Sequence, residues 1–369
     1  MRRICFLLLA GLLAVSCGQD DFNRLKINVD KALKRPVRCA ELFVKADVIP
    51  LRVPDGIRVG QGETLLEVAT DRFFLLNQER DAILVFDGAG ECVTVLRSTE
   101  PVIDFSPYRD QVLTVLTAHT ITEYAIQDGT VLASYPIQSD GFNLRCVARI
   151  NDDSIYQLGD KDGKAYYFSY LISKRSFFPT KLPSSLNSTM EASETQSSRY
   201  FHDGDRCYSF LTQSGRIFGY DASSGFSWID FIPDFGKAEI RLTNAQKTGN
   251  HTYYAFERNG ESGVLVCNYG NGMYKAVRKT VEGSVFPLGV IYAGNNYYCC
   301  PAARLPEFLP DAPANGGEEH VIIRYALLAS DLAVFRLSGR SKGKEQTAYE
   351  KSDAEDLLCG AAGRGPVRM

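Results

Sequence analysis

The chain has 369 residues, of which 45% are hydrophobic and 23% charged, and its formal net charge is −3 at pH 7. This balance excludes the basic surface by which nucleic-acid-binding proteins attract phosphates, so no nucleic-acid partner is expected. With four histidines and ten cysteines in the whole chain, the composition favours neither a metal site nor a disulfide scaffold. We therefore predict no metal and no cofactor.

The N-terminus is typical of an export signal. Two arginines precede an uncharged apolar run over residues 4–15, which is shorter than the roughly 20 residues that a membrane-spanning helix needs. The run leads into Ala14-Val15-Ser16 directly before Cys17, which resembles the lipobox of bacterial lipoproteins, with Ala14 where leucine is usual. The resemblance implies that residues 1–16 are a signal peptide and that Cys17 carries a diacylglycerol. The alternative is an ordinary secretory signal cut nearby, with Cys17 incidental.

Residues 17–40 are expected to hold the lipidated cysteine and a tether. The segment directly after Cys17, with sequence GQDD, resembles the surface-export signal of lipoproteins from Bacteroides-like bacteria; the alternative is a plain solvated linker. No later segment is long and apolar enough to span a membrane. The resemblance implies a lipid-anchored protein of the bacterial outer membrane and leaves open whether it faces the cell surface or the periplasm.

Residues 41–337 contain a unit that recurs six times. Each copy has a turn of Asp, Asn or Gly, an apolar-aromatic strand, a second turn and a further strand that ends in an aromatic residue. The first turns lie near residues 71, 110, 152, 204, 250 and 295, at intervals of roughly 40 to 50 residues. Each interval has room for four strands of about five or six residues. The pattern predicts an all-β, six-bladed β-propeller with four-stranded antiparallel blades; a pair of β-sandwiches is the rival.

Four segments give this prediction a family resemblance. The chain resembles the six-bladed β-propeller lipoproteins of Bacteroides-type bacteria at residues 48–51 (VIPL), 85–90 (VFDGAG), 103–105 (IDF) and 321–325 (VIIRY). It departs from that family at residues 97–101, where RSTEP replaces a glycine-rich Gly-Pro-Glu segment. These motifs are structural, so the resemblance implies a fold and no activity. We further expect residues 42–51 to complete the last blade by pairing beside it; the alternative is a strand over residues 332–337.

Most cysteines of the mature chain lie in apolar strand-like runs. We expect them to be free, buried and to act as small hydrophobic side chains; the alternative is oxidation of some pairs after export. They are Cys39, Cys92, Cys146, Cys207, Cys267, Cys299, Cys300 and Cys359.

Few residues suggest catalysis, so no catalytic residue is predicted. Ser341 lies in a Gly-x-Ser-x-Gly pattern, but the last histidine, His320, precedes it, and the tail 338–369 is too polar to fold. The cluster His202, Asp203, Asp205 and Cys207 could imitate a metal site, although its place in the repeat indicates a strand turn. Residues 160–163 (DKDG) are similar to a calcium loop but favour a hairpin tip.

Ser154 is the one further modification site that we predict. The tripeptide Asp153-Ser154-Ile155 resembles the acceptor of general O-glycosylation in these bacteria. The alternative is a turn that enters a strand.

The longest predicted connections, 183–196, 233–240 and 301–319, all fall on one face of a propeller. Function gathers on such loops over a rigid scaffold, so we predict a monomeric binding module for an envelope glycan, peptide or protein partner. The alternative is a hydrolase or lyase, which would bring three or more carboxylates or histidines together at the central channel. For the insertion 301–319, the alternative is a passive lid; in either case we expect it to be separable from the fold.

Overall fold

The computed structural model describes residues 24–38, 41–60, 65–137, 141–162, 164–179, 199–203, 206–211, 215–221, 227–236, 239–268, 272–278, 286–312 and 320–328. The chain divides into two compact units, Met1–Val334 and Phe335–Met369, and all described residues belong to the first. Cys17, Ser341 and the tail 338–369 therefore lie outside the described residues, and the predictions made for them stay predictions.

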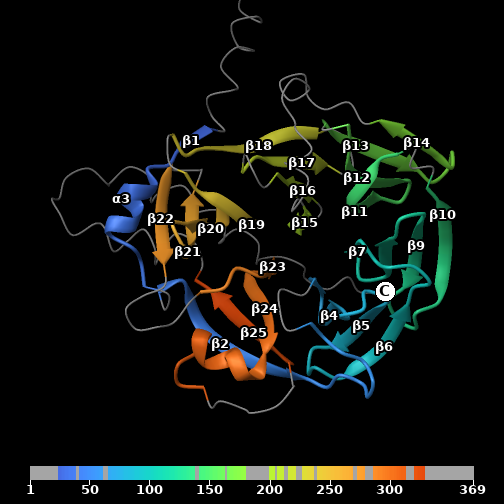
Figure 1. Cartoon of the computed structure of the whole chain (residues 1–369), viewed down its shortest axis with the longest axis horizontal. Helices are drawn as coiled ribbons and strands as arrows, with labels where there is room; N and C mark the ends of the chain where they lie inside the picture. Colours follow the sequence, from blue (N-terminus) through green and yellow to red (C-terminus); the bar gives the residue numbers. More distant parts are fainter. Residues whose placement is uncertain are drawn as a thin grey trace, which may run out of the picture. The chain divides into compact units, whose positions relative to one another are not determined.

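The strands of the described part form six sheets, which we number in chain order (Figure 1). The first sheet holds β3 (Leu66–Ala69), β4 (Arg72–Leu76), β5 (Ala82–Asp87) and β6 (Cys92–Arg97). The second holds β7 (Asp104–Tyr108), β8 (Val112–Leu116), β9 (Thr120–Ala125) and β10 (Val131–Pro136), and the third β11 (Asn143–Asn151), β12 (Ser154–Lys161), β13 (Lys164–Leu171) and β14 (Ser176–Pro179). The fourth holds β15 (Arg199–Asp203), β16 (Arg206–Phe210), β17 (Ile217–Asp221) and β18 (Ser227–Asp234). The fifth holds β19 (Arg241–Thr248), β20 (His251–Arg258), β21 (Glu261–Asn268) and β22 (Met273–Arg278).

The sixth sheet joins both ends of the folded unit. It holds β23 (Val290–Tyr292), β24 (Asn295–Pro301) and β25 (His320–Leu327), and its outer strand is the N-terminal β2 (Phe43–Leu51). β2 pairs antiparallel with β25, from Lys45 opposite Ala326 to Leu51 opposite His320. The expectation that residues 42–51 complete the last sheet is therefore confirmed. Closure in this way covers two strand edges at once.

The turn motif at residues 85–90 contributes to this closure. The amide of Arg52, just after β2, donates to the carbonyl of Gly90 in the β5–β6 turn at 2.9 Å. Gly90 has a φ of +87°, and a Cβ there would lie 2.0 Å from the carbonyl oxygen of Pro50. Only glycine allows the first sheet to approach the outer strand of the sixth so closely.

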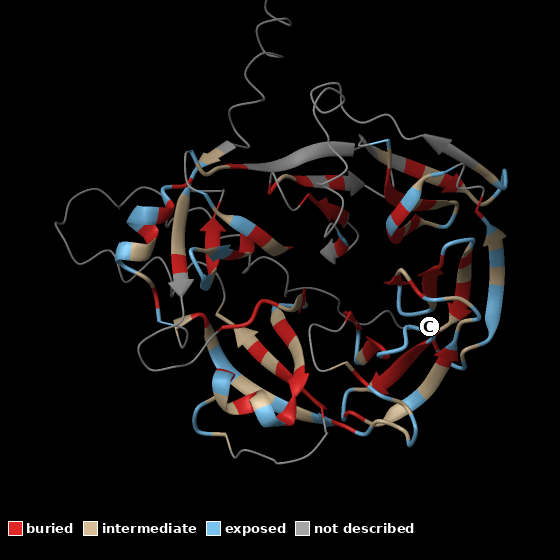
Figure 2. Cartoon of the chain, in the orientation of Figure 1, coloured by how far each residue is buried: buried red, intermediate tan, exposed pale blue. Residues whose placement is uncertain are grey.

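The innermost strands of the six sheets contact one another in a closed cycle. β3 contacts β7, β7 contacts β11, β11 contacts β15, β15 contacts β19, β19 contacts β23, and β23 returns to β3. Figure 2 shows the outer strands β2 and β10 mostly exposed or intermediate, in contrast to the strands nearer the centre. This radial arrangement is that of a β-propeller, and it excludes the pair of β-sandwiches.

Apolar side chains fill the spaces between neighbouring sheets. Between the first and second sheets, Phe74 and Val85 pack with Phe105, Leu113 and Val115, and each is at most 1% exposed. A buried Phe or Val contributes about 1.5–3 kcal/mol relative to an exposed one. Because a middle strand has a neighbouring sheet on both sides, β4 and β5 are apolar along almost their whole length.

The cysteines behave as predicted. Six of them fall within the described residues, all are free, and Cys146, Cys207, Cys267 and Cys300 are buried. Burial raises the pKa of the Cys146 and Cys207 thiols well above the ordinary value, which keeps them protonated.

The segment before β2 adds structure that the sequence pattern did not reveal. β1 (Arg24–Lys26) pairs parallel with β18, outside the fourth sheet. Helix α3 (Val29–Lys34) begins at Asn28, whose side chain accepts from the amide of Lys31, and it buries Val29 and Ala32 beside β22. A helix of six residues is too short to show a 3.6-residue period. Residues 24–38 therefore cross the outer edges of the fourth and fifth sheets before β2 joins the sixth.

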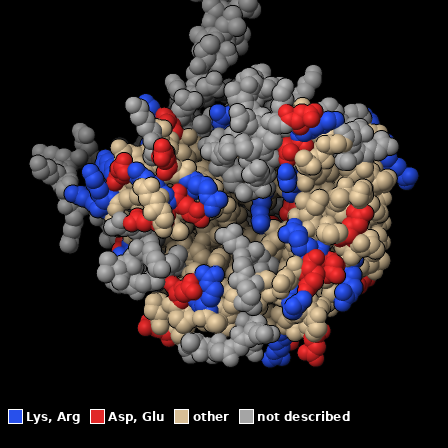
Figure 3. Space-filling model, in the orientation of Figure 1, with Lys and Arg blue, Asp and Glu red and all other residues tan. Residues whose placement is uncertain are grey.

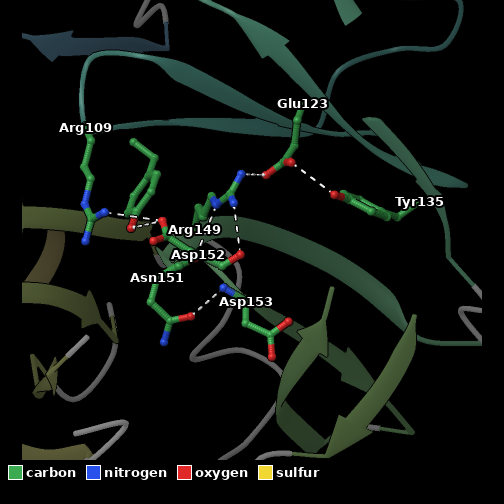
Figure 4. A network of polar contacts seen from close by, with 8 residues as sticks. Arg109, Glu123, Tyr135, Arg149, Asn151, Asp152 and Asp153 are labelled. Atoms are coloured by element: carbon green, nitrogen blue, oxygen red, sulfur yellow. Dashed lines mark hydrogen bonds and ion pairs between the residues drawn. The ribbon is translucent and has the colours of Figure 1, made fainter. Parts of the chain in front are cut away.

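A polar network joins the second and third sheets (Figure 4). Glu123 of β9 forms an ion pair with Arg149 of β11, and their side chains are 4% and 13% exposed. The second carboxylate oxygen of Glu123 accepts from the Tyr135 hydroxyl at 3.1 Å. The Arg149 guanidinium also donates to the carbonyls of Asn151 and Asp152, at 3.2 and 3.1 Å. All of these groups are thereby partnered.

Removal of one member of this ion pair is expected to cost much more than removal of both. Arg149→Met leaves the Glu123 carboxylate buried without its cation and should lower the free energy of unfolding by about 3–5 kcal/mol. The double variant Glu123→Leu/Arg149→Met should recover most of this loss, as urea denaturation would measure. Arg52→Ala, which breaks an exposed pair with Glu91, is the control and should change stability by less than about 1 kcal/mol. Equal losses in single and double variants would contradict the interpretation.

Candidate functional site at the mouth of the central channel

The starts of the inner strands define one end of the ring that these strands form, and we call this end the mouth of the central channel. Each sheet repeats the same antiparallel order, so the six inner strands run in the same direction around the axis. Their first residues, the connections that lead into them and the β24–β25 connection therefore share one face. The described residues that lead into β19 and those that follow β24 belong to this face. Loop 183–196 and parts of loops 233–240 and 301–319 lie outside the described residues, so the grouping of the three loops on one face stays a prediction.

Four charged residues lie at or next to the starts of inner strands on this face. One of them, Arg241 of β19, is exposed and paired with Glu257, and the other three act on one another. Asp104 and Arg199 are the first residues of β7 and β15, and Glu67 is the second residue of β3. They come from the second, fourth and first sheets. They are separated by up to 132 positions in the sequence, and only closure of the ring brings them near one another.

Glu67 is a carboxyl group in poorly hydrated surroundings. Part of its side chain stays accessible, yet protein atoms surround the carboxyl group closely. Desolvation, and secondly the nearby charge of Asp104, raise the pKa of Glu67 to about 8, whereas the Arg199 cation lowers it. Glu67 is therefore mostly protonated at neutral pH and can donate a hydrogen bond.

Asp104 is more deeply buried, with 6% exposure, but it is better partnered. Its Oδ2 accepts from the amide of Val147 in β11 at 2.9 Å. Desolvation raises the pKa of Asp104 to about 6, against the lowering effects of Arg199, the Val147 amide and Arg80. Arg80 is held nearby by hydrogen bonds to the carbonyls of Val102 and Ile103 at 2.8 and 2.7 Å. Asp104 is therefore mostly ionised at pH 7.

Arg199 supplies the positive charge of the site. Its side chain is exposed, and its charge acts on Glu67 in the first sheet, Asp104 in the second and Cys146 in the third. Charges interact appreciably only within about 10 Å in salt solution. Arg199 is the first residue of β15, which contacts the inner strands β11 and β19.

The three groups can recognise a polar ligand together. At neutral pH the Arg199 guanidinium and the protonated Glu67 donate hydrogen bonds, while Asp104 accepts them. On the face in view in Figure 3, positive and negative side chains are interspersed, so no single-sign field dominates that face. Within the described residues there is no group of three or more His, Cys, Asp or Glu that could hold a metal ion.

None of the residues singled out from the sequence is one of these three charged groups, although the charge of Glu67 acts on the buried Cys207 thiol. Ser154 is the first residue of β12, half-buried and opposite Leu171. The neighbouring Asp153 carboxylate accepts from the amide and hydroxyl of Ser173 at 2.6 and 2.9 Å. The turn that enters a strand is thus present, and O-glycosylation of Ser154 stays a prediction.

Two other segments form hairpins, as the sequence predicted. His202 lies opposite Cys207 at the end of the β15–β16 hairpin, in agreement with a strand turn. Lys161 lies opposite Lys164 at the β12–β13 tip, as expected for residues 160–163.

The described part of the 301–319 insertion differs from the expectation. It forms a 3-10 turn, η3 (Ala302–Arg304), and a short helix, α4 (Leu305–Phe308), which bury Leu305 and Phe308 at 3% and 4% exposure. Phe308 packs edge to face on Tyr298 of β24 at 5.1 Å between ring centroids. The expectation that this insertion is separable from the fold is therefore wrong, because its apolar residues belong to the core of the sixth sheet.

Sequence reasoning missed Glu67 and Arg199, and it treated Asp104 only as part of the motif at residues 103–105. The one available signal was positional, since all three lie at or beside the expected start of an inner strand. Other inner strands also begin with a polar or charged residue, such as Asn143 and Arg241, so this position alone does not mark the site.

Comparison with known proteins supports the fold. No protein-family model and no curated protein sequence matches the chain. A putative exported protein from Bacteroides fragilis is similar over 82% of this chain and 98% of its own, with a TM-score of 0.59 and 10% identity. A member of the duf4221 family from Bacteroides vulgatus is similar over 77% and 96%, with a TM-score of 0.49 and 11% identity. At such low identity the similarity to the Bacteroides fragilis protein shows the fold alone.

In the part of the chain that the structure describes, no helix combines the length and the apolar character needed to cross a membrane.

Proposed function

We propose that this protein is a lipid-anchored, six-bladed β-propeller of the bacterial cell envelope that binds a polar ligand at the mouth of its central channel. The observation that carries the proposal is the convergence of Glu67, Asp104 and Arg199 at one end of the ring. The six sheets and the closed cycle of inner strands support a count of six blades. The ligand would be a group of an envelope glycan, peptide or protein partner, and the propeller itself a monomer.

The channel-mouth residues can be tested by capture. The full mature chain, purified in detergent, would be immobilised and exposed to glycan and peptide fractions of the native cell envelope. Arg199→Ala and the double variant Glu67→Gln/Asp104→Asn should each reduce capture at least about tenfold, because each hydrogen bond lost between a charged group and the ligand costs roughly 1.5–3 kcal/mol. Arg52→Ala, an exposed arginine beside the outer strand β2, is the control. Capture that is the same in all variants would place the binding surface elsewhere.

The anchor rests on the sequence and on the exported character of the Bacteroides fragilis relative. Cys17→Ser should move the protein from the membrane fraction to the soluble fraction, because one thiol carries the acyl chains. Immunoblotting of fractionated cells measures this. Unchanged attachment to membranes would contradict lipidation at Cys17.

One observation favours a hydrolase or lyase at the same place as the second candidate. The two neighbouring carboxyl groups have pKa values near 8 and near 6, a separation that suits an acid and a base for proton transfer. In that case Asp104→Asn would abolish turnover of a captured glycan or peptide but not its capture. A binding module would show no turnover in the wild-type protein.

A further inference from the structure

A second polar region lies between the second and third sheets, beside the buried ion pair of Figure 4. On β8, Thr114 lies directly opposite Glu123 of β9, so both side chains point to the same side of the second sheet. Glu123 contacts Arg149 of β11. Thr114 therefore faces the third sheet.

The facing surface of the third sheet carries a glutamine. Arg149 lies opposite Ile155 of β12, and Gln157 is two residues further along that strand, so both face the second sheet. Gln157 itself lies opposite Val147, whose amide donates to Asp104 of the second sheet. The register of four strands thus brings Gln157 and Thr114 into one inter-sheet space.

Both polar side chains are fully enclosed and lack a protein partner. Gln157 and Thr114 are each 0% exposed. Neither Oε1 nor Nε2 of Gln157, nor Oγ1 of Thr114, has a hydrogen-bond partner within the described structure. Exchange of the amide oxygen and nitrogen of Gln157 would give neither atom a hydrogen bond, because no partner lies within reach of either position. The apolar residues Leu116, Val147 and Phe168 belong to the core between these sheets, and the buried Ser106 of β7 lies directly opposite Thr114.

Buried polar groups in native proteins are almost always hydrogen-bonded, either to protein or to an internal water molecule. A dry arrangement would leave three polar atoms unsatisfied in one small region. Water supplies two donors and two acceptors, and so suits a group of amide oxygen, amide nitrogen and hydroxyl. We propose that an internal water site between the second and third sheets bridges Gln157 and Thr114.

This site would have a structural consequence for the channel mouth. Gln157 lies opposite Val147, and the Val147 amide is the donor that holds Asp104. Water bound at Gln157 would thus fix the same stretch of β11 that orients Asp104. The inference rests on the burial and register of these strands and does not depend on the proposed function.

Thermal unfolding of isosteric variants tests the proposal by the sign of the effect. Thr114→Val keeps the shape of the side chain and removes its hydroxyl. If water bridges the two groups, Thr114→Val and Gln157→Leu should each lower the melting temperature by about 2–5 °C, because each breaks hydrogen bonds to the water. The double variant should lose less than the sum, since both losses act through one water. Thr122→Val is the control, because the Thr122 hydroxyl lies at an exposed position, 3.4 Å from the hydroxyl of Ser134 on the outer strand β10.

An unsatisfied dry pair predicts the opposite sign. Thr114→Val would then raise the melting temperature or leave it unchanged, and that outcome would overturn the proposal. If Gln157→Leu fails to fold, two other results decide whether the water is present. They are the sign of the change in melting temperature of Thr114→Val and a crystal structure of the wild-type protein. Density for a water within about 3.2 Å of both side chains supports the site, and its absence at high resolution overturns it.

Discussion

A rise in pH from 5 to 8.5 is expected to destabilise the wild-type protein, and Glu67→Gln is expected to remove most of this effect. The pKa of Glu67 is about 8 in the folded protein against an ordinary value of 4.5. Below pH 4.5 the Glu67 carboxyl is protonated in both the folded and the unfolded chain, so it adds no pH dependence to the free energy of unfolding. As the pH rises, the unfolded chain releases its proton first while the folded protein retains it, so stability falls until the pH passes about 8.

The expected magnitude is about 2–4 kcal/mol, since each unit of pKa difference corresponds to 1.36 kcal/mol and Glu67 keeps some access to water. This corresponds to a decrease of about 5 °C in the melting temperature. Asp104 adds to the fall at lower pH, because its pKa is raised from 3.8 to about 6. Calorimetric melting at pH 5, 6, 7 and 8.5 measures both contributions.

Two variants separate these contributions. Glu67→Gln should flatten the dependence above pH 6 and leave the part due to Asp104. Glu91→Gln, which removes an exposed carboxylate beside Arg52, should leave the whole dependence unchanged. A wild-type melting temperature that is constant between pH 6 and 8.5 would mean that the Glu67 carboxyl is well hydrated, and the channel-mouth site would lose one of its hydrogen-bond donors.

The fold was predictable because local signals repeat. Each copy of the unit places turn residues between apolar strands. One copy indicates little, but the same pattern at regular intervals along the chain indicates a repeat architecture. The first turns of all six copies fall at the connection between the inner strand and its neighbour, for example at Thr70–Asp71 and at Gly249–Asn250. The apolar strands β4 and β5 follow from burial between two sheets, which is also a property of a radial arrangement.

The candidate site was not predictable in the same way. Glu67 and Arg199 each look like an ordinary charged residue in the sequence, and their meaning arises from the closure of the ring. To predict that they lie close together, one must know which strands from distant parts of the chain meet in the ring. A local sequence pattern does not contain this information. The same holds for Gln157 and Thr114, whose polar atoms would be unremarkable on an exposed strand.

The insertion after β24 shows a different limit. Its prolines indicated a stiff loop, and loops are commonly exposed. Leu305 and Phe308 lie three residues apart, on one side of a single helical turn. One turn is too short to show a helical period in the sequence, so the pattern could not predict that this side is buried. Burial in this part of the chain is decided by the sixth sheet, with which the insertion packs.

Loss of β2 is expected to have the largest effect on the fold. Deletion of residues 18–53 removes the outer strand of the sixth sheet and the segment over the fourth and fifth sheets. It exposes the edge of β25, where Val321, Ile322 and Ile323 are at most 4% exposed in the intact protein. An exposed apolar edge is a template for pairing between molecules. We expect an aggregated product without a cooperative thermal transition, as size-exclusion chromatography and circular dichroism would show.

A shorter deletion is the matched control. Removal of residues 18–26 takes away β1, whose pairing with β18 covers three residues, and leaves α3 and β2 in place. This variant should stay monomeric and lose only a few degrees in melting temperature, because the sixth sheet keeps its outer strand. β2 also carries Pro50, which is tolerated at an edge strand and cannot donate to a further strand, so the intact edge resists pairing between molecules. A folded, monomeric product from the longer deletion would show that another segment, such as residues 332–337, can take the place of β2, and the closure by the N-terminal strand would then not be essential to the ring.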